Sequence, residues 1–360
     1  MAPAQPLRLA RLIVILFCSL TLLLPTAAWA GLPPGNAVTD PAALLRDALP
    51  FDQPDLRELQ HLLEHTDTDL RASRWSVIRR NCQRAVSQLP RLDARVGGDL
   101  EAKGVSDRDQ LDQLAADLRA VCAASQGQGD RDAFLAVREA ALADIGAIET
   151  QLVDGFPFEI PAEFDALPRL LGRATVELET SKGRITTIVD GYNAPLTAGA
   201  YVDLVQRGFY DGLPFDRAEQ FYVLQTGNPR GAADGFVDPD SGEERNVPLE
   251  IRIPGERDPF YNLTFEELGL YKAVPTLPFS SYGTLGWAHS DRALDDGSSQ
   301  FFMFLFQPQL TPAGLNLIDG RYAAFGYVVD GFTVLQELGA DDRIIEARVI
   351  EGGDGLRAHA

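Results

Sequence analysis

The apolar residues of this chain change their spacing once, and that change divides the chain into two kinds of structure. From about Val38 to Val153 they recur every three or four residues, which is the period of an amphipathic helix. From Arg173 onward they alternate with polar residues, as in the run ATVELE at residues 174–179, which is the period of a half-buried strand. One pattern cannot serve as the other. We therefore predict an α + β chain with two domains, a helical one followed by a strand-rich one.

Two short helices are expected at the start of the helical half. Asp40 and Pro41 are an N-cap and a first-turn proline, so a helix is predicted to begin there and to end near Leu49. A second short helix is expected over residues 55–64, directly after Pro54. Both pieces are too short to be stable without packing against other elements.

Three longer amphipathic helices follow. Their apolar stripes are Trp75, Ile78, Cys82, Ala85 and Leu89, then Leu111, Leu114, Leu118 and Val121, and then Phe134, Val137, Ala141, Ile145, Ile148 and Leu152. Breaks are expected at Gly97-Gly98, at Gly104 and at residues 127–129. None of these helices can bury its stripe alone, so an antiparallel bundle is predicted over residues 31–155.

The beginning of the chain has the pattern of a cleaved export signal. Arg8 and Arg11 give it a positive start, and an apolar run follows over residues 12–24. Ala28-Trp29-Ala30 then places small residues at the two positions that a signal peptidase reads. The apolar run is shorter than the roughly 20 residues that span a bilayer. We predict that residues 1–30 are a signal peptide, the alternative being an uncleaved anchor, and that no membrane span remains after its removal.

The charge of the chain excludes some classes of partner. The formal net charge is −20 at pH 7. Nucleic-acid binding needs a basic footprint, so no nucleic-acid partner is expected. An acidic surface also disfavours anionic lipid and is otherwise typical of a soluble protein.

Two pairs of side chains in the helical half have spacings that suggest a cross-link or a metal. Cys82 and Cys122 lie on predicted neighbouring helices, and in an oxidising compartment they are a disulfide candidate, the alternative being two buried thiols. His61 and His65 are four residues apart on a predicted helix. No HExxH motif surrounds them and no carboxylate is well placed in the sequence, so no metal site is predicted.

The strand-rich half is predicted to be a closed antiparallel β-barrel capped by helices. Residues 174–179 and 185–189 form a hairpin around Ser181-Lys182-Gly183. Further strands are expected at residues 221–225, 283–288, 301–306, 323–328 and 344–350, and helices at residues 195–206 and 333–338. Many short strands with few helices favour a barrel.

Five segments of this half resemble the signature of the cyclophilin family. They are Asn193-Ala194-Pro195, the run GFYDGLPFDR at residues 208–217, QTGN at 225–228, GSSQFF at 297–302, and Asp319-Gly320-Arg321 with Phe325-Gly326. The resemblance implies a cyclophilin-like domain over residues 173–352, with a linker at 156–172 and a tail at 353–360. An export signal, a helical half and a divergent cyclophilin half together resemble the large cyclophilin-like proteins of the thylakoid lumen.

The resemblance implies catalysis of rotation about X–Pro peptide bonds, whose barrier is about 18–20 kcal/mol. By the resemblance, Arg217 addresses the prolyl nitrogen and Gln225 positions the peptide backbone. The implied substrate-binding residues are Tyr222, Val223, Ala288, His289, Gln300, Phe302, Leu317 and Tyr322. Phe302 would be the floor of an apolar proline pocket. No covalent step occurs in this chemistry, and no metal or cofactor is expected.

Several of these positions depart from the family. Asp216 and Tyr322 stand where the family usually has histidines, and Tyr222 stands where it has a phenylalanine. His289 replaces an asparagine, and Leu317 replaces a tryptophan. Asp216 can also draw the guanidinium of Arg217 away from the substrate. Together the substitutions are expected to weaken or abolish catalysis on simple peptides, whereas binding of proline-containing segments is expected to survive.

The stretch between Gln225 and Gly283 is longer than a cyclophilin core requires. It is acidic at Asp234, Asp238, Asp240, Glu243 and Glu244. A strand is expected at residues 247–253 and a short helix near 264–268. Long structured insertions are usually functional, and the alternative is a decorated loop.

Three functions follow from these patterns. The first is an exported peptidyl-prolyl cis-trans isomerase that assists the folding of proline-containing clients. The second is a catalytically weak cyclophilin-like chaperone or assembly factor for photosystem II in the thylakoid lumen, in which the helical domain covers or regulates the site. The third is a structural adaptor that only binds. The export signal serves the thylakoid lumen and the periplasm of a cyanobacterium equally.

Overall fold

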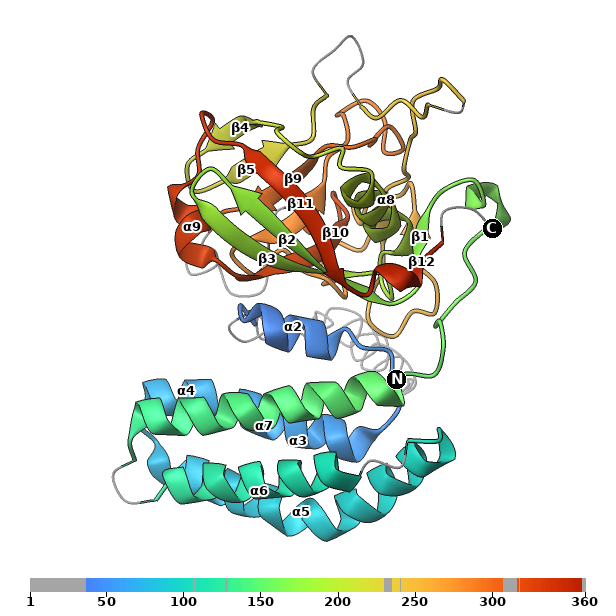
Figure 1. The fold of residues 1–360 in the computed structure, drawn as a ribbon. Coiled ribbons are helices and arrows are strands. Elements are labelled where there is room, and N and C mark those ends of the chain that lie inside the picture. The colour runs from blue at the N-terminus through green and yellow to red at the C-terminus, as the bar shows by residue number, and fades with distance from the viewer. Residues whose placement is uncertain are drawn as a thin grey trace, which may run out of the picture.

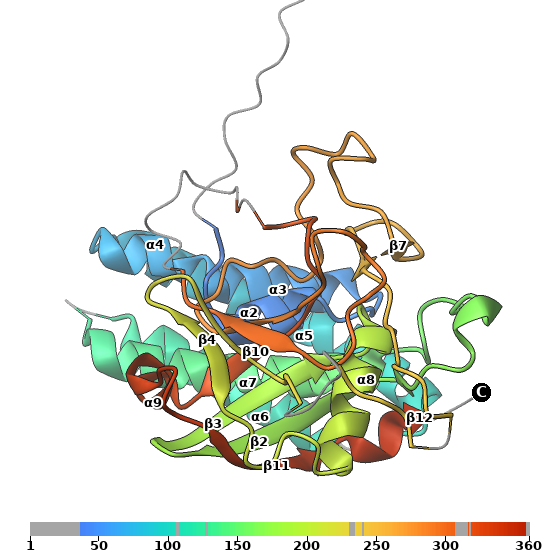
Figure 2. The same cartoon turned by 90° about the horizontal axis from the view of Figure 1, so that it is seen from above.

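The fold is that of a computed structural model, which describes residues 37–105, 108–126, 129–229, 235–239, 241–306, 316 and 318–357. The expected signal peptide lies outside these residues. The chain forms a layer of helices below a strand-rich unit, with one short helix between the two (Figure 1). Figure 2 shows the same layers from above. Within the described ranges, no helix has the length and apolar character needed to cross a membrane.

The helical layer buries its own core. Its helices are α3 (Pro54–Glu64), α4 (Thr66–Arg71), α5 (Trp75–Ala102), α6 (Arg108–Ala124) and α7 (Arg131–Leu152). The apolar stripes expected from the sequence face one another, and Ile78, Leu114 and Phe134 are fully buried among them. We refer to α3–α7 as the helical unit.

Two details of the helical unit differ from expectation. Gly97-Gly98 does not end a helix, because α5 continues to Ala102 and also contains Pro90. A Cβ atom on Gly97 would lie 3.5 Å from Leu111 of α6, so this glycine lies at a close helix–helix contact. Packing of the stripe beyond Pro90 against α6 outweighs the low helix propensity of glycine. The short helix α4 has no counterpart in the sequence prediction.

Helix α2 (Pro41–Asp47) does not pack into the helical core. Its N-cap Asp40 accepts a hydrogen bond from the N–H of Ala42, as the sequence predicts. Its apolar residues Leu44, Leu45 and Ala48 are buried in the core of the strand-rich unit instead. Helix α2 therefore lies between the two units and packs its apolar side on the sheet unit (Figure 1).

The strand-rich unit is an eight-stranded antiparallel sheet in the order β11-β2-β3-β10-β8-β9-β5-β4. The strands are β2 (Arg173–Thr180), β3 (Gly183–Asp190), β4 (Phe215–Glu219), β5 (Val223–Thr226), β8 (Thr284–Trp287), β9 (Phe301–Phe304), β10 (Ala324–Asp330) and β11 (Ile344–Glu351). Helices α8 (Pro195–Gln206) and α9 (Phe332–Glu337) flank the sheet. We refer to this part as the sheet unit.

The two edges of the curled sheet meet at one point. Pro214, just before β4, and Arg343, just before β11, form an isolated antiparallel bridge. Beside it, the N–H of Phe215 donates to the carbonyl of Asp342 at 3.0 Å. The prediction of an antiparallel sheet with helices is confirmed, but within the described residues no ladder closes the sheet into a complete barrel.

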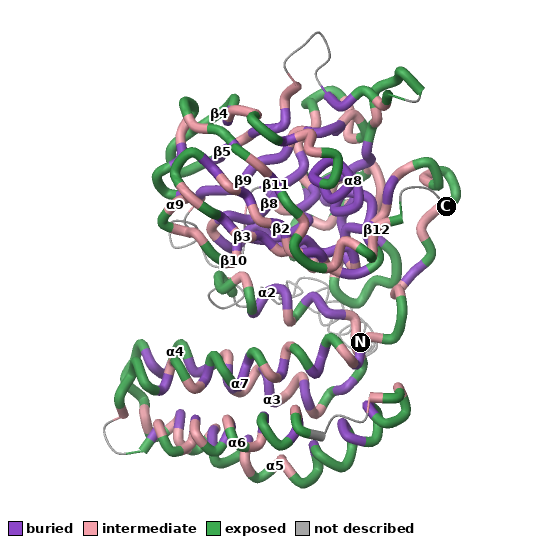
Figure 3. Tube along the Cα trace, in the orientation of Figure 1, coloured by how far each residue is buried: buried purple, intermediate pink, exposed green. Residues whose placement is uncertain are grey.

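The core of the sheet unit is built around α8, which is mostly apolar and is buried from Pro195 to Val205. The ring of Tyr201 on this helix lies 5.1 Å from that of Phe301 and 5.2 Å from that of Phe325. Strand β2 buries every second residue, as its sequence predicts. Figure 3 shows that buried residues gather in the sheet and α8.

The ends of the sheet unit are held to each other. Strand β1 (Arg169–Leu170) pairs with β12 (Leu356–Arg357). The other short elements are the 3₁₀ turns η1 (Ala162–Phe164) and η3 (Gly353–Gly355). The segment expected to be a linker, residues 156–172, is thus hydrogen-bonded at its end to the expected tail.

The insertion between β5 and β8 is part of the same core. Strands β6 (Glu250–Ile251) and β7 (Phe260–Tyr261) pair within it. The buried carboxylate of Glu250 accepts hydrogen bonds from the N–H groups of Leu196 and Thr197, which caps the N-terminus of α8. Burial raises the pKa of Glu250 to about 7.

Two expectations for the insertion differ from the structure. The strand expected over residues 247–253 is limited to β6 and one bridge at Val247. The helix expected near 264–268 is a single turn, which closes with a hydrogen bond from Leu268 to Thr264. Of the acidic positions noted in the sequence, Asp234 and Asp240 lie outside the described residues.

Candidate functional site

The register of the strands places five residues in one row across the sheet, three of them predicted from the sequence. Arg217 of β4 lies directly opposite Gln225 of β5, and Gln225 lies opposite Phe302 of β9. The row continues through Gly286 of β8 to Ala324 of β10. Directly opposed residues on antiparallel neighbours point to the same face of a sheet. The row therefore runs from a cationic edge to an apolar centre.

Phe302 is the apolar centre of the row. Its side chain is almost fully buried. A Cβ atom on Gly286 would lie 2.3 Å from Cζ of Phe302, so the ring can occupy this place only because position 286 is glycine. The ring stacks on Phe279 with centroids 5.8 Å apart, and it meets Tyr322 edge-on at 5.4 Å.

Arg217 is half-exposed at the edge of the sheet. Its Nε donates to Oε1 of Glu219 at 2.6 Å. The two residues are two positions apart on a strand and so share a face. The guanidinium carbon also lies 5.7 Å from the ring centroid of Tyr222. The acid that pairs with the guanidinium in this row is Glu219.

The remaining polar side chains of the site lie beside Gln225. Its Nε2 donates to Oε1 of Gln300 at 2.8 Å. The backbone N–H of Ala288 donates to the carbonyl of Gln300 at 3.0 Å, which brings the two residues together. His289 follows Ala288, and its ring stacks on Tyr322 at 4.7 Å.

Tyr322 is a partly buried residue at the apolar end of the site. Burial is the main cause that raises the pKa of its hydroxyl above the ordinary value. Asp291 and Tyr222 raise this pKa further, and Arg217 opposes them. Arg321 acts in the same direction as Arg217.

The structure brings most of the sequence-derived site residues to this face. The contacts above link eight of them, which are Arg217, Tyr222, Gln225, Ala288, His289, Gln300, Phe302 and Tyr322. Val223 is buried opposite Phe304 and supports the floor. Leu317 lies outside the described residues.

Four residues of the site, namely Glu219, Phe279, Gly286 and Ala324, escaped the sequence prediction. Glu219 could have been found from the period of a strand, because a residue two positions after Arg217 on a strand lies on the same face. Nothing in the local sequence marks Phe279 or Gly286, because their contacts with Phe302 come from distant parts of the chain.

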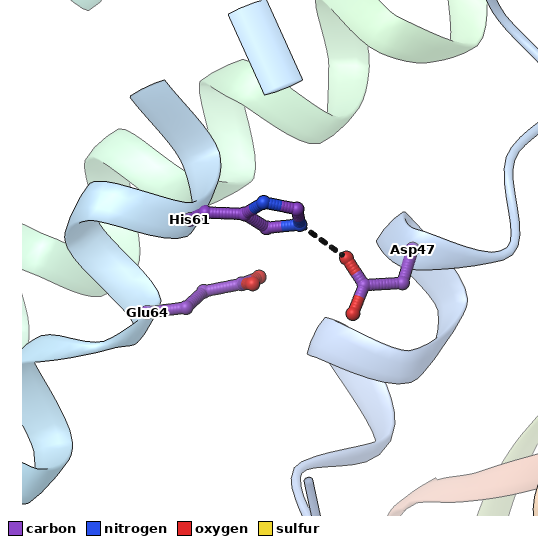
Figure 4. A group of neighbouring side chains, drawn as sticks. All are labelled: Asp47, His61 and Glu64. Atoms are coloured by element: carbon purple, nitrogen blue, oxygen red, sulfur yellow. Dashed lines mark hydrogen bonds and ion pairs between the residues drawn. The ribbon is translucent and has the colours of Figure 1, made fainter. Parts of the chain in front are cut away.

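A second cluster of ionisable groups lies between α2 and α3. Figure 4 shows Asp47, His61 and Glu64, whose nearest ligand atoms lie within 4.8 Å of one another. Nε2 of Gln60 donates to Asp47 at 2.8 Å and to both oxygens of Glu64 at 3.2 Å, and Arg46 donates to Glu64 at 2.9 Å. The cluster is therefore a hydrogen-bonded seam between the helices.

The two helical cysteines are free thiols that lie in contact between α5 and α6. A hydrogen bond to Cys122 is the main cause that raises the pKa of Cys82, and the same bond lowers the pKa of Cys122. The disulfide between them stays a prediction.

The sheet unit thus presents a row of side chains with a cationic edge and an apolar floor. The family model for cyclophilin-type peptidyl-prolyl cis-trans isomerases matches residues 175–354. A second model, for the PsbQ-like domain of CYP38-like peptidyl-prolyl cis-trans isomerases, matches residues 40–153. The chain belongs to the cyclophilin-type peptidyl-prolyl cis-trans isomerase family.

Relatives match across both units. A Synechocystis protein, named for a peptidyl-prolyl cis-trans isomerase of the thylakoid lumen, is 46% identical over 323 residues, covering 89% of this chain and 85% of its own. The chloroplastic CYP38 of Arabidopsis thaliana is 40% identical, covering 89% of this chain and 76% of its own. The crystal structure of a Cryptosporidium parvum cyclophilin with the dipeptide Ala-Pro matches 49% of this chain and 99% of its own, at 20% identity and a TM-score of 0.36.

Proposed function

We propose that this protein is an exported isomerase that accelerates rotation about X–Pro bonds of protein clients. The row formed by Arg217, Gln225 and Phe302 carries this proposal. It joins a cation, an amide and an apolar surface on one face of a rigid sheet, and prolyl isomerisation needs these three groups.

The chemistry requires no covalent intermediate. Rotation about the bond interrupts amide resonance, whose barrier is about 18–20 kcal/mol. In the twisted state the prolyl nitrogen becomes pyramidal and gains a lone pair. The guanidinium of Arg217 stabilises that lone pair more than the planar amide, which lowers the barrier.

The other two residues hold the substrate. The proline ring packs against Phe302 and the neighbouring aromatic rings, while Gln225 bonds the flanking backbone. Glu219 holds Nε of Arg217 and offsets part of its positive charge. We therefore expect modest turnover, because the developing lone pair meets a partly neutralised cation.

Exchange spectroscopy on a proline-containing peptide tests the proposal. The wild-type protein should raise the cis–trans exchange rate above the uncatalysed one, and Arg217→Ala should remove at least about nine-tenths of that gain. Arg184→Ala is the matched control, because Arg184 is also an exposed, acid-paired arginine on a strand. No acceleration by the wild-type protein, or equal rates for Arg217→Ala and wild type, would contradict the proposal.

We also propose a second role, as an assembly factor that holds a proline-containing loop of a photosystem II subunit in the thylakoid lumen. The names of the two relatives support the compartment, and the helical unit joined to the site-bearing unit supports a role beyond simple turnover. A cleaved signal peptide at residues 1–30, as the sequence predicts, belongs to the same proposal.

Cell fractionation tests this second role. A tagged protein should be found in the thylakoid lumen, and a strain without the protein should accumulate less photosystem II. A tagged protein found only in the periplasmic fraction would exclude the role, whatever the isomerase assay shows.

A further inference from the structure

Phe221 has both an unusual backbone and an unusual exposure. Its φ is +62°, in the left-handed region that bulky residues rarely adopt. It is the third residue of a turn between β4 and β5, which closes with a hydrogen bond from the N–H of Tyr222 to the carbonyl of Glu219 at 3.0 Å. Glycine or asparagine is usual at this place in such a turn. The side chain of Phe221 is nevertheless 58% exposed.

The other strained positions have a structural explanation that Phe221 lacks. Among the described residues, only Ser73 and Asn262 share a positive φ without being glycine, and both are small and polar. Asn262 exchanges hydrogen bonds with Leu249 through its backbone N–H and its side-chain oxygen. In the part of the chain that the structure describes, the ring of Phe221 meets no other aromatic ring and no cation. The fold therefore gains little from an aromatic residue here.

The turn that carries Phe221 belongs to the candidate site. Its two arms hold Arg217 and Gln225, which face each other across β4 and β5. The next residue, Tyr222, has its ring 5.7 Å from the guanidinium carbon of Arg217 and 6.0 Å from the ring of Phe304. Phe221 thus stands exposed at the tip of the hairpin that carries Arg217 and Gln225.

We propose that Phe221 determines substrate specificity by contacting an apolar or aromatic side chain of the client, next to the bound proline. Strained backbone conformations are retained at binding sites when they serve binding, and an exposed aromatic ring gains most by covering another apolar side chain. This inference rests on the proposed prolyl-binding function of the row.

The experiment compares two peptides that differ only in the residue after proline, phenylalanine or alanine. Exchange spectroscopy gives kcat/KM for each, and the ratio of the two values is the readout. The wild-type protein should prefer the phenylalanine peptide, and Phe221→Gly should reduce that ratio about fivefold, which corresponds to about 1 kcal/mol. Tyr271→Ala is the matched control, because Tyr271 is an aromatic residue of the insertion with 72% of its surface exposed.

The thermal midpoint separates a binding role from a structural one. Glycine relieves the left-handed strain, so Phe221→Gly should have a Tm equal to or above that of the wild type. A Tm lowered by more than about 2 °C would show that the ring supports the fold and would overturn the inference. A preference ratio that is unchanged in Phe221→Gly would overturn the inference as well. Loss of the accelerated exchange of both peptides in Arg217→Ala would leave the proposed function intact.

A failure of the proposed function gives a different result. If the wild-type protein accelerates neither peptide, the Kd values of the same two peptides, from amide chemical-shift titration, replace the rates. A wild-type preference for the phenylalanine peptide that Phe221→Gly removes would then still support the contact. Equal Kd values for the two peptides in the wild-type protein would overturn it.

Discussion

The two sides of helix α2 differ in what holds them. The sheet side combines an apolar core with hydrogen bonds from Arg173 and Asn193 to the backbone of α2, whereas the helical side is held mainly by charged and polar side chains. Toward the sheet unit, Leu44, Leu45 and Ala48 are buried in an apolar core. Toward the helical unit, Asp47 meets His61 and Gln60 of α3, and Arg46 meets Glu64. Apolar burial depends little on pH or salt, whereas hydrogen-bonded charges depend on both. The attachment of α2 to the sheet should therefore be constant, and its attachment to the helical unit adjustable.

A buried carboxyl group strengthens this contrast. Glu149 of α7 is fully buried, and its nearest cation is Arg57 of α3 at 3.9 Å. Burial raises the pKa of Glu149 from its ordinary value to about 8. The helical unit next to the seam thus contains a group whose charge changes near neutral pH.

The largest effect is expected on the apolar side of α2. Leu44→Ala should reduce the free energy of unfolding of the sheet unit by about 2–4 kcal/mol, because it removes buried methyl groups and leaves a cavity. Trp287 reports this transition during urea unfolding in a Trp75→Phe background, which removes the tryptophan of the helical unit. Val38→Ala, at an exposed apolar residue just before α2, is the control. A loss below about 1 kcal/mol for Leu44→Ala would mean that α2 is only loosely attached to the sheet.

The second effect is a pH dependence that originates in the helical unit. The folded-state pKa of Glu149 is raised, so its contribution to stability is complete below about pH 4.5 and is lost as the pH rises through about 8. Between pH 5 and 8 the free energy of unfolding should fall by on the order of 2–3 kcal/mol. Glu149→Gln stays neutral at every pH, so it should remove most of this fall in the free energy of unfolding. Unfolding is followed by the helical signal of circular dichroism.

The control for the pH experiment is Glu139→Gln, at an exposed position of the same helix. It should leave the pH dependence of the wild type in place. An equally steep fall in Glu149→Gln would assign the dependence to other carboxyl groups, such as Glu250, whose pKa burial raises to about 7.

The contrast between the two sides of α2 also explains what sequence patterns can and cannot predict. Helix α8 begins and ends where its proline and apolar period predict, because those signals are local. The partner of α2 is not local information. Leu44 and Leu45 make an apolar stripe that fits either core, and only the three-dimensional contacts decide between them. Gly97 shows the same limit, since a packing partner on α6 keeps it helical.

The candidate site divides in the same way. The family signature identifies Arg217, Gln225 and Phe302, and strand register then explains why they lie in a row. The signature says nothing of Glu219 or of the strained conformation of Phe221. Both depend on the local path of the β4–β5 hairpin, which motif spacing does not encode.

The smallest effect is expected on the polar side of α2. The hydrogen bond to Asp47 is the main cause that raises the pKa of His61. The stabilising contribution of this pair is therefore complete below about pH 6.5 and is lost as the pH rises through the raised value. Asp47→Asn should bring the pKa of His61 down toward its ordinary value, as followed by the ring proton shifts in an NMR titration. The loss of stability at pH 6 should stay within about 1 kcal/mol, because both side chains are partly exposed to solvent.

The control for this last variant is Asp93→Asn, which makes the same charge change at an exposed position of α5. It should leave the titration of His61 unchanged. If Asp47→Asn destabilised the protein as strongly as Leu44→Ala, the polar seam would hold α2 as firmly as the apolar core does. The helical unit would then be a fixed part of the molecule, and pH would have no means of adjusting its hold on the unit that carries the site.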